Sequence, residues 1–293
     1  MTKIREIEAK TLLSHSSKPD TYFGLKYNMN LYRGCQHRCI YCDSRSECYQ
    51  IEDFDGEVLV KTNAIELLRK ELASKRVKGV IGLGSMNDPF MPIERKYRLA
   101  GQALEIIAEF GFPIHIITKS DHILDELETI KRIARVYATV SFTVTTADDD
   151  LATKVEPLAP RPSRRLAAMR VLADNGIQTG VTMMPILPFI EDTEENIRGV
   201  VAAAADAGAT YILGWMGMTL RNRQRDYYYR ELDRHFPGVR EKYREVYRDR
   251  YEAESPWSKK LYALFGNLCQ QYGLKTKLPL WAPQHTEQLS LFG

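Results

Sequence analysis

The chain has 293 residues, of which 44% are hydrophobic and 27% charged, a composition typical of a globular protein with room for a large core. Its net charge of +3 is too small to indicate a nucleic-acid partner, which is recognised by local clusters of Lys and Arg. No apolar run reaches membrane-spanning length, and the start of the chain, MTKIREIEAK, lacks the apolar core of a signal peptide. We therefore expect a cytoplasmic protein with reduced thiols.

Strand-like and helix-like segments alternate along the first two thirds of the chain. The predicted strands, rich in Val, Ile, Thr and Tyr, are 26–32, 79–83, 114–118, 138–144, 178–183 and 211–214. The predicted helices, with apolar residues at three- and four-residue spacing, are 63–76, 94–110, 123–134, 162–175 and 194–207. Asp192, together with Glu195, is the expected cap of the last helix. Strands that alternate with helices predict parallel pairing, and hence an α/β fold with a partial TIM barrel of the (β/α)6 type.

The first predicted strand leads into LYRGCQHRCIYC, where Cys35, Cys39 and Cys42 form a C-x3-C-x2-C motif. Three thiolates this close together can bind one iron–sulfur cluster, and they leave one iron of a four-iron cluster without a protein ligand. A zinc site is the first alternative, but it normally takes four ligands and would need His37 to complete the set. A disulfide framework is a weaker alternative, because the chain is long and poor in cysteine.

Polar residues follow the second and third predicted strands and line one face of the fourth. Ser85 and Asp88 lie in a glycine-containing turn after the second strand, and Lys119 follows the third strand directly. Ser141 and the hydroxyl residues after it at a spacing of two share one face of the fourth strand. In a barrel of this type the working residues lie where strands end, so these positions favour an enzyme over a purely structural metal site. A solvent-facing lysine remains the alternative for Lys119.

The cysteine motif resembles that of the radical S-adenosylmethionine (SAM) superfamily. Together with the passages 88–94, 118–120, 156–165 and 185–192, it resembles the spore photoproduct lyase-like branch, also described as DNA repair photolyase-related. The resemblance implies that the three cysteines hold a [4Fe-4S] cluster whose open iron binds SAM. It also implies that the reduced cluster cleaves SAM to a 5′-deoxyadenosyl radical, which abstracts a hydrogen atom from the substrate.

The same resemblance implies roles for five further residues. Tyr41 would pack near the SAM adenine, Ser85 and Asp88 would lie at the SAM amino group, and Lys119 and Ser141 would approach the carboxylate and the ribose. It predicts a lyase-like enzyme of DNA repair or modification, with a nucleic-acid substrate and a reductase or flavodoxin-type electron donor. A radical SAM enzyme acting on a peptide or small molecule is the alternative, and a non-catalytic, metal-stabilised protein that binds a partner is another.

One departure from the branch concerns the hydrogen donor. Spore photoproduct lyases carry a hydrogen-donating cysteine in the turn that corresponds to 85–88, where this chain has Met86. A thioether cannot return a hydrogen atom to a product radical. Asp43 also stands where those lyases have a tyrosine after the third cluster cysteine. The resemblance therefore supports the branch rather than the thymine-dimer reaction, and Cys48, the one nearby thiol, is the candidate catalytic residue.

The composition changes after residue 220. We expect an N-terminal segment over 1–22, the barrel over 23–220, a mainly helical extension over 221–282 and a tail over 283–293. Within 221–260 there are twelve Lys or Arg and eight Asp or Glu, interleaved with tyrosines, a pattern that could bind single-stranded nucleic acid. The helical spacing of Val239, Tyr243, Val246 and Tyr247 favours instead the buried stripe of an amphipathic helix. A short helix over 261–268 and an extended segment over 274–281 are expected to follow.

The tail ends in QLSLF followed by glycine, and this run resembles the QLxLF peptide by which bacterial DNA-repair and replication proteins bind the sliding clamp. Gln288 would be the polar anchor, and Leu289, Leu291 and Phe292 complete the predicted partner-binding set, the last two in an apolar pocket. A tail folded back onto the barrel is the alternative.

Overall fold

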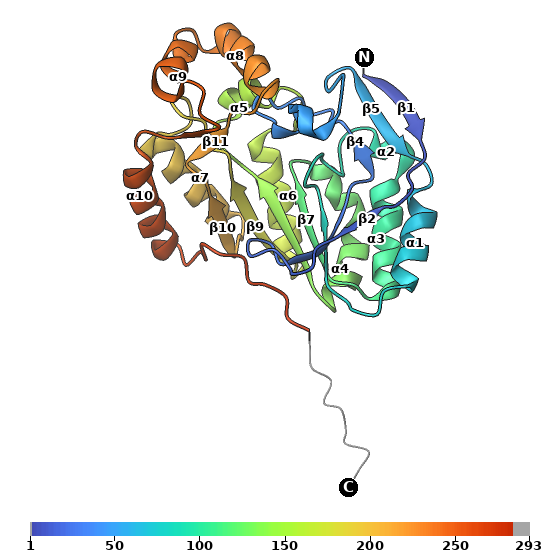
Figure 1. Ribbon diagram of the computed structural model, residues 1–293. Coiled ribbons are helices and arrows are strands. Elements are labelled where there is room, and N and C mark those ends of the chain that lie inside the picture. The colour runs from blue at the N-terminus through green and yellow to red at the C-terminus, as the bar shows by residue number, and fades with distance from the viewer. Residues whose placement is uncertain (1, 284–293) are drawn as a thin grey trace.

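The computed structural model describes residues 2–283. Its central sheet contains the strands β2 (Leu13–His15), β3 (Leu25–Met29), β6 (Val80–Leu83), β7 (Ile114–Thr118), β8 (Ala138–Thr143), β9 (Gln178–Met183) and β10 (Tyr211–Gly214). Their order is β10-β9-β8-β7-β6-β3-β2, and all pairs are parallel except β2 with β3. The parallel strands are those predicted from the sequence, with small shifts at their ends. The α/β fold with a partial barrel is therefore confirmed (Figure 1).

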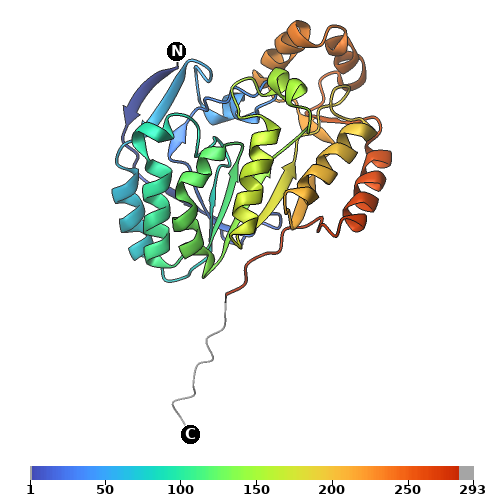
Figure 2. The same ribbon diagram turned by 180° about the vertical axis from the view of Figure 1, so that it is seen from behind.

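Helices line up over one face of this sheet, as Figure 2 shows from behind. They are α1 (Ala64–Ala73), α3 (Leu99–Phe110), α4 (Leu127–Ala134), α6 (Pro162–Asp174) and α7 (Glu194–Asp206). Their apolar sides and the buried strand residues form the main hydrophobic core, in which Ile81, Ile116 and Val140 are completely buried. Burial of this apolar area is the principal force that holds the helices on the sheet.

Three details of the predicted helices were wrong. The segment 94–110 is two helices, α2 (Glu94–Tyr97) and α3, because Arg98 has a left-handed backbone with φ of 48°. The Glu94 carboxylate accepts hydrogen bonds from the Ala100 and Gly101 amides at the new helix start. The segment 123–134 begins as a 3-10 helix, η3 (Asp121–Glu126). Thr193, not Asp192, caps α7, by accepting a hydrogen bond from the Asn196 amide.

A second, smaller sheet was not predicted from the sequence. It contains β1 (Lys3–Ile7), β5 (Glu57–Lys61) and β4 (Tyr32–Arg33) in the order β1-β5-β4. β4 leads directly into the cysteine loop, so the pairing of β4 with β5 fixes where that loop begins. At the junction Gly34 has φ of 85°, and a Cβ atom there would lie 2.6 Å from the Glu57 carbonyl oxygen. Only glycine fits this close approach.

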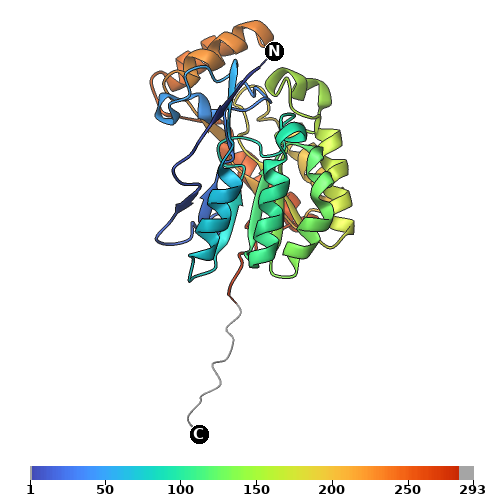
Figure 3. The same cartoon turned by 90° about the vertical axis from the view of Figure 1, so that its right-hand side faces the viewer.

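The C-terminal extension lies beside the cysteine loop at one end of the sheet (Figures 1 and 3). The extension contains α8 (Gln224–His235), α9 (Val239–Tyr247), β12 (Glu252–Glu254) and α10 (Ser258–Gln271). The short elements around it are η1 (Asp43–Arg45), η2 (Glu47–Tyr49), α5 (Asp149–Val155) and β11 (Gly217–Thr219). α10 is longer than predicted, and the segment 274–281 makes only one β-bridge, between Lys275 and Tyr211.

The tyrosines of the extension are mainly core residues. Tyr228, Tyr229, Tyr243 and Tyr247 are buried in one aromatic cluster, so their rings are unavailable for stacking on bases. The amphipathic interpretation of α9 is confirmed for Tyr243 and Tyr247 but wrong for Val246, which is 39% exposed.

Two sequence predictions concern features outside these elements. Gln288, Leu289, Leu291 and Phe292, predicted to bind the sliding clamp, lie outside the described residues. Within residues 2–283, no helix has the length and apolar character needed to cross a membrane.

Candidate active site

The three cysteines of the motif line one cavity of about 210 Å³ at the carboxyl ends of the strands. Its wall combines the cysteine loop, the turn after β6, the ends of β7 and β8, and the segment that leads into β11. The lining residues include Cys35, His37, Cys39, Tyr41, Cys42, Asp43, Ser85, Met86, Asn87, Asp88, Lys119, Thr143, Pro185, Trp215, Met218 and Thr219. Of the predicted cofactor-binding residues, Tyr41, Ser85, Asp88 and Lys119 are therefore brought together with the three thiols.

The turn after β6 approaches β7 closely. Gly84 has φ of 97°, and a Cβ atom on it would lie 2.0 Å from the Ile117 carbonyl oxygen, so no other residue fits there. This close approach places Ser85, Met86 and Asn87 along one side of the cavity. The Asn87 amide is fixed by its hydrogen bond to the Tyr32 carbonyl, which joins the turn to β4.

Two of the three thiols, those of Cys35 and Cys39, lie in a desolvated position. All three cysteines are free, and burial, reinforced by the Asp88 carboxylate, raises the pKa of the Cys35 thiol to about 12. Burial also raises the pKa of Cys39. Thiolates are therefore unfavourable here unless a cationic centre compensates their charge, which is what an iron–sulfur cluster does when it binds deprotonated cysteine. The donor set thus fits such a cluster.

A mononuclear metal site fits less well. No group of three His, Cys, Asp or Glu side chains within residues 2–283 is close enough to hold a single metal ion. His37, which would have to complete a zinc site, instead lies with its Nε2 3.1 Å from Asp88 Oδ2 and its Nδ1 3.4 Å from the Leu158 carbonyl oxygen. A polynuclear cluster does not need its thiolates to converge on one atom.

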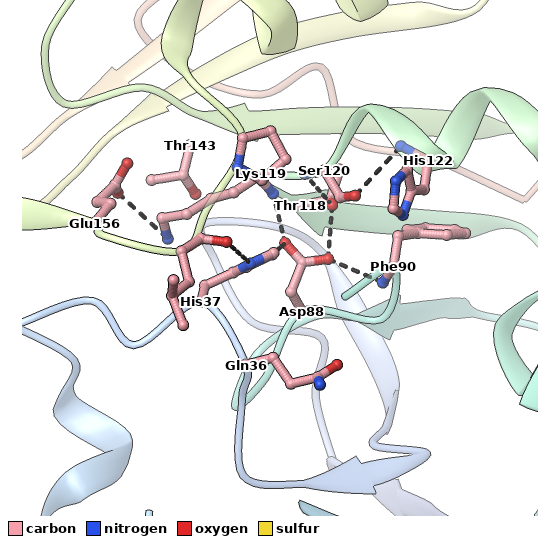
Figure 4. A network of polar contacts seen from close by, with 12 residues as sticks. Gln36, His37, Asp88, Phe90, Thr118, Lys119, Ser120, His122, Thr143 and Glu156 are labelled. Carbon is pink, nitrogen blue, oxygen red and sulfur yellow. Dashed lines mark hydrogen bonds and ion pairs between the residues drawn. The ribbon is translucent and has the colours of Figure 1, made fainter. Parts of the chain in front are cut away.

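Asp88 is the centre of a buried network (Figure 4). Its carboxylate accepts hydrogen bonds from the Phe90 amide at 2.9 Å, Thr118 Oγ1 at 2.8 Å and the Lys119 amide at 2.6 Å, besides the contact with His37. Burial alone would raise the pKa of Asp88, but His37 and the amides of Lys119 and Phe90 lower it to about 2. Both oxygens of this ionised carboxylate are thus occupied by protein donors.

Lys119 and Tyr41 meet at a buried glutamate that the sequence did not single out as a site residue. Tyr41 donates its hydroxyl hydrogen bond to Glu156, and Lys119 Nζ lies 3.8 Å from Glu156 Oε1 and 5.7 Å from the centre of the Tyr41 ring. The Arg165 guanidinium contacts the other Glu156 oxygen at 2.5 Å and donates to the Thr143 carbonyl at 2.9 Å. Although burial favours the neutral acid, Arg165 and Lys119 lower the pKa of Glu156, so it is ionised.

Ser141 is not brought to the cavity. It is completely buried, and its hydroxyl lies 2.8 Å from His115 Nε2 and 2.6 Å from the Tyr211 hydroxyl. Thr143, two residues further along β8, lines the cavity instead. This placement does not support a contact between Ser141 and the SAM ribose.

The extension holds the cysteine loop from its outer side. Asp43, directly after Cys42, accepts hydrogen bonds from Thr219 Oγ1 at 2.8 Å and the Tyr49 hydroxyl at 3.0 Å, and its Oδ1 lies 2.8 Å from Arg221 Nε. The buried Gln224 side chain donates to the Tyr41 carbonyl at 3.1 Å. These contacts connect residues that lie far apart in the sequence.

Arg45 supports the same loop. Its guanidinium binds Asp55 through two hydrogen bonds of 2.6 Å and lies between the rings of Phe54 and Tyr227, at 4.6 and 3.6 Å from their centres. Arg45 Nε donates to the Cys39 carbonyl at 3.4 Å. Arg45 thus helps to hold the backbone of Cys39, and Gln224 holds that of the neighbouring Tyr41. Neither Arg45 nor Gln224 was predicted, because no local pattern marks a contact of this kind.

Cys48 lies outside the wall of this cavity. It is exposed in η2, and its Sγ accepts a hydrogen bond of 3.1 Å from Arg221. It lines a neighbouring cavity that also includes Met86 and Asn87.

Residues 29–230 match the sequence profile of the radical SAM superfamily. The chain belongs to the radical SAM superfamily. It is 32% identical over 230 residues to an uncharacterized protein of Mycobacterium tuberculosis, which covers 76% of this chain and 67% of that protein. It is 27% identical over 158 residues, 54% of this chain and 32% of the relative, to a Pseudomonas phage M6 protein named radical SAM Nalpha-GlyT isomerase.

The fold is also that of a solved radical SAM structure. A variant of spore photoproduct lyase with bound AdoMet and dinucleoside spore photoproduct superposes with a TM-score of 0.69 at 14% identity, covering 93% of this chain and 80% of that one. The predicted superfamily and the fold of the spore photoproduct lyase-like branch are confirmed. This chain is accordingly an enzyme of the radical SAM class, whose cofactors are a [4Fe-4S] cluster and SAM.

Proposed function

We propose that Cys35, Cys39 and Cys42 hold the [4Fe-4S] cluster and that the adjoining cavity binds SAM. The observation that carries this proposal is that three free thiols line the same cavity as Lys119 and Tyr41. When bound, the cluster and SAM together supply a 5′-deoxyadenosyl radical that abstracts hydrogen from a substrate carbon. A reductase or flavodoxin-type protein would provide the electron.

The chain's own residues position SAM and exclude water. Lys119 offers an ammonium to the SAM carboxylate, Ser85 offers a hydroxyl near the amino group, and Tyr41 offers a ring face for the adenine. Asp88, whose oxygens are already occupied, fixes the backbone of Lys119 and so acts by positioning it. Trp215 and Met218 contribute apolar surface to the cavity wall, which would limit the access of water to a reactive carbon radical.

We further propose a nucleic-acid substrate, in DNA repair or modification. Support comes from the likeness to spore photoproduct lyase, which has been solved with a dinucleoside spore photoproduct. Because Met86 occupies the turn and Cys48 lies outside the SAM cavity, the reaction differs from a thymine-dimer lyase that returns hydrogen from a cysteine in that turn. Cys48 remains the candidate thiol for any hydrogen return.

Anaerobic reconstitution tests the first proposal. We expect about four iron and four sulfide per chain, and 5′-deoxyadenosine on reduction in the presence of SAM. Replacing any one of Cys35, Cys39 and Cys42 with Ala should abolish cluster assembly, while Cys269→Ala, a buried cysteine outside the cavity, should leave the iron content unchanged. Stoichiometric zinc without iron would show that the site is not an iron–sulfur site.

The sliding-clamp proposal has a separate test. A peptide spanning residues 283–293 should compete with the full-length protein for the clamp of the same organism, and a peptide with Leu291→Ala and Phe292→Ala should not, since anchor residues in such pockets contribute about 2 kcal/mol or more each. Absence of clamp binding at tens of micromolar would end that proposal without affecting the cluster.

A further inference from the structure

A second cavity of about 340 Å³ adjoins the cofactor cavity. Met86 and Asn87 line both, so the turn after β6 is a wall common to the two. The other lining residues of the second cavity are Asn30, Tyr32, Arg33, Gly34, Cys48, Tyr49, Gln50, Ile51 and Lys61. A substrate that reaches the cofactor cavity past Met86 would therefore place its adjoining part in this space.

The charge of the second cavity is entirely positive. Its wall contains Lys61 and Arg33 and no carboxylate. Lys61 donates to the Asn30 carbonyl at 2.6 Å, and Arg33 donates to the carbonyls of Tyr49 and Gln50 at 2.9 and 3.1 Å. Within the described part of the chain, neither cation has an ion pair with a carboxylate. Neutral carbonyl acceptors orient these groups without compensating their charge, and the one carboxylate that acts on Lys61, that of Glu71, lies outside the cavity wall and forms no ion pair with it.

A neighbouring hollow, which Arg33 also lines, provides a contrast. There Lys3 and Arg5 both pair with Glu57, at 3.8 and 2.9 Å, and Glu52 and Asp53 also line the wall. In this hollow, carboxylates therefore balance the charge of the cations. The lack of a carboxylate is a property of the second cavity itself.

The position of Lys61 makes an anion energetically favourable. It is partly buried at the end of β5, and burial, together with the repulsion of Arg33, lowers the pKa of its ammonium. An oxyanion between the two cations would relieve both effects, because opposite charges stabilise the protonated lysine and charge-assisted hydrogen bonds replace lost solvation. A phosphodiester has the single charge and the multiple acceptor oxygens that two separated cations can share.

We propose that the second cavity binds a phosphodiester of the nucleic-acid substrate through Lys61 and Arg33, while the neighbouring nucleoside passes Met86 into the cofactor cavity. This inference rests on the proposed nucleic-acid function and specifies how the substrate is held. It assigns Lys61 and Arg33 to substrate binding and not to the cofactor.

The test measures binding of a short fluorescein-labelled single-stranded oligothymidylate to the reconstituted enzyme with SAM, by fluorescence anisotropy. Lys61→Gln should weaken binding about tenfold, the effect of losing one charge-assisted hydrogen bond, and reduce the slope of log affinity against log salt by about one. Lys61→Arg keeps the charge and should restore most of the affinity. Lys26→Gln is the matched control, because Lys26 also donates to a backbone carbonyl, that of Ser17 at 2.9 Å, but lies outside the cavity.

An oligothymidylate with uncharged methylphosphonate linkages separates phosphate recognition from base recognition, because wild type and Lys61→Gln should bind it equally. If the ordinary oligothymidylate binds wild type and Lys61→Gln equally well, the phosphate site is overturned while the nucleic-acid function stands. If wild type binds no oligonucleotide, the nucleic-acid function fails, and calorimetry with inorganic phosphate decides the cavity. If wild type binds phosphate and Lys61→Gln does not, the second cavity is still an anion site. If wild type binds only a glutamate-rich peptide, or binds neither the peptide nor phosphate, the phosphate site is overturned.

Discussion

The cysteine loop is held from two sides by networks of opposite character. On the barrel side, Glu156 and Arg165 form an ion pair whose side chains are each 1% exposed. On the extension side, Asp43 and Arg221 are 34% and 28% exposed. The barrel ion pair is itself shielded from water, whereas the extension ion pair can exchange its contacts with solvent. The difference indicates that the barrel side sets the electrostatics of the site and the extension side sets the position of the loop.

The largest expected effect is on the barrel side. Glu156→Ala leaves Arg165 buried without its partner and removes the acceptor of the Tyr41 hydroxyl. We expect a loss of about 3–5 kcal/mol in the free energy of unfolding, measured in urea on the cluster-free protein. Glu109→Ala, which breaks an exposed ion pair with Arg69, is the control and should cost far less. Equal losses in the two variants would mean that burial does not distinguish these networks.

A second buried glutamate on the barrel side, Glu191, sharpens the comparison, because no Lys, Arg or His among residues 2–283 forms an ion pair with it. Glu191 accepts hydrogen bonds from Thr145 Oγ1 at 2.7 Å and the Leu187 amide at 3.0 Å, and burial raises its pKa from 4.5 to about 8. Between these values the unfolded chain has released a proton that the folded chain keeps. The contribution of Glu191 to the free energy of unfolding is therefore fully present below about pH 4.5 and falls as the pH rises towards about 8.

Glu191→Gln mimics the neutral acid and should remove this dependence. The difference in unfolding free energy between variant and wild type should change in favour of the variant by up to about 1.4 kcal/mol per pH unit within that window. Measuring the difference cancels the contribution of Glu94, another buried carboxyl whose pKa burial raises, to about 7. Parallel stability curves for the two proteins would show that Glu191 is ionised, as Glu156 is.

The third effect concerns the cofactor. Lys119→Met should weaken SAM binding by about 1.5–3 kcal/mol if the ammonium meets the SAM carboxylate, which calorimetry on the reconstituted protein would measure. Lys131→Met, a change in an exposed lysine paired with Glu128, should have no effect. Iron content must be compared in parallel, because Lys119 also lies close to Glu156. Unchanged SAM affinity with a full cluster would exclude the contact.

The sequence predicted the barrel side better than the extension side. Apolar periodicity is a local signal, so the parallel strands and the position of Ser85, Asp88 and Lys119 at strand ends followed from it. A spacing of two identifies a face of a strand but not the height of a residue along the barrel. For that reason Ser141 was predicted in the cavity, while Thr143 is the residue that lines it.

The extension side depends on contacts over long sequence separations. Gln224 reaches the Tyr41 carbonyl across 183 positions, and Thr219 reaches Asp43 across 176. β4 has two residues and β5 has five, and although Val58-Leu59-Val60 is an apolar run typical of a strand, so short a run does not indicate its partner strand. The sequence also did not indicate that both Asp88 oxygens are occupied, because the donors are backbone amides, the Thr118 hydroxyl and His37, which only folding brings together.

The smallest expected effect is on the extension side. Asp43→Asn loses the charge that faces Arg221 and keeps one acceptor oxygen, for Thr219 Oγ1. Its NH2 group replaces the oxygen that accepts from the Tyr49 hydroxyl, and that hydroxyl can accept from the NH2 group instead. Because this ion pair is about one third exposed, solvent screening limits its contribution, and we expect a loss of no more than about 1 kcal/mol in unfolding free energy. Asp43 follows Cys42 directly, so the variant should nevertheless release iron to a chelator faster than wild type, with the same iron content before the chelator is added. Arg221→Gln removes the other partner, and the double variant should release iron no faster than the faster single variant, because both changes break the same contact. If Asp43→Asn lowers stability as much as Glu156→Ala, or leaves iron release unchanged, the extension does not act by positioning the loop.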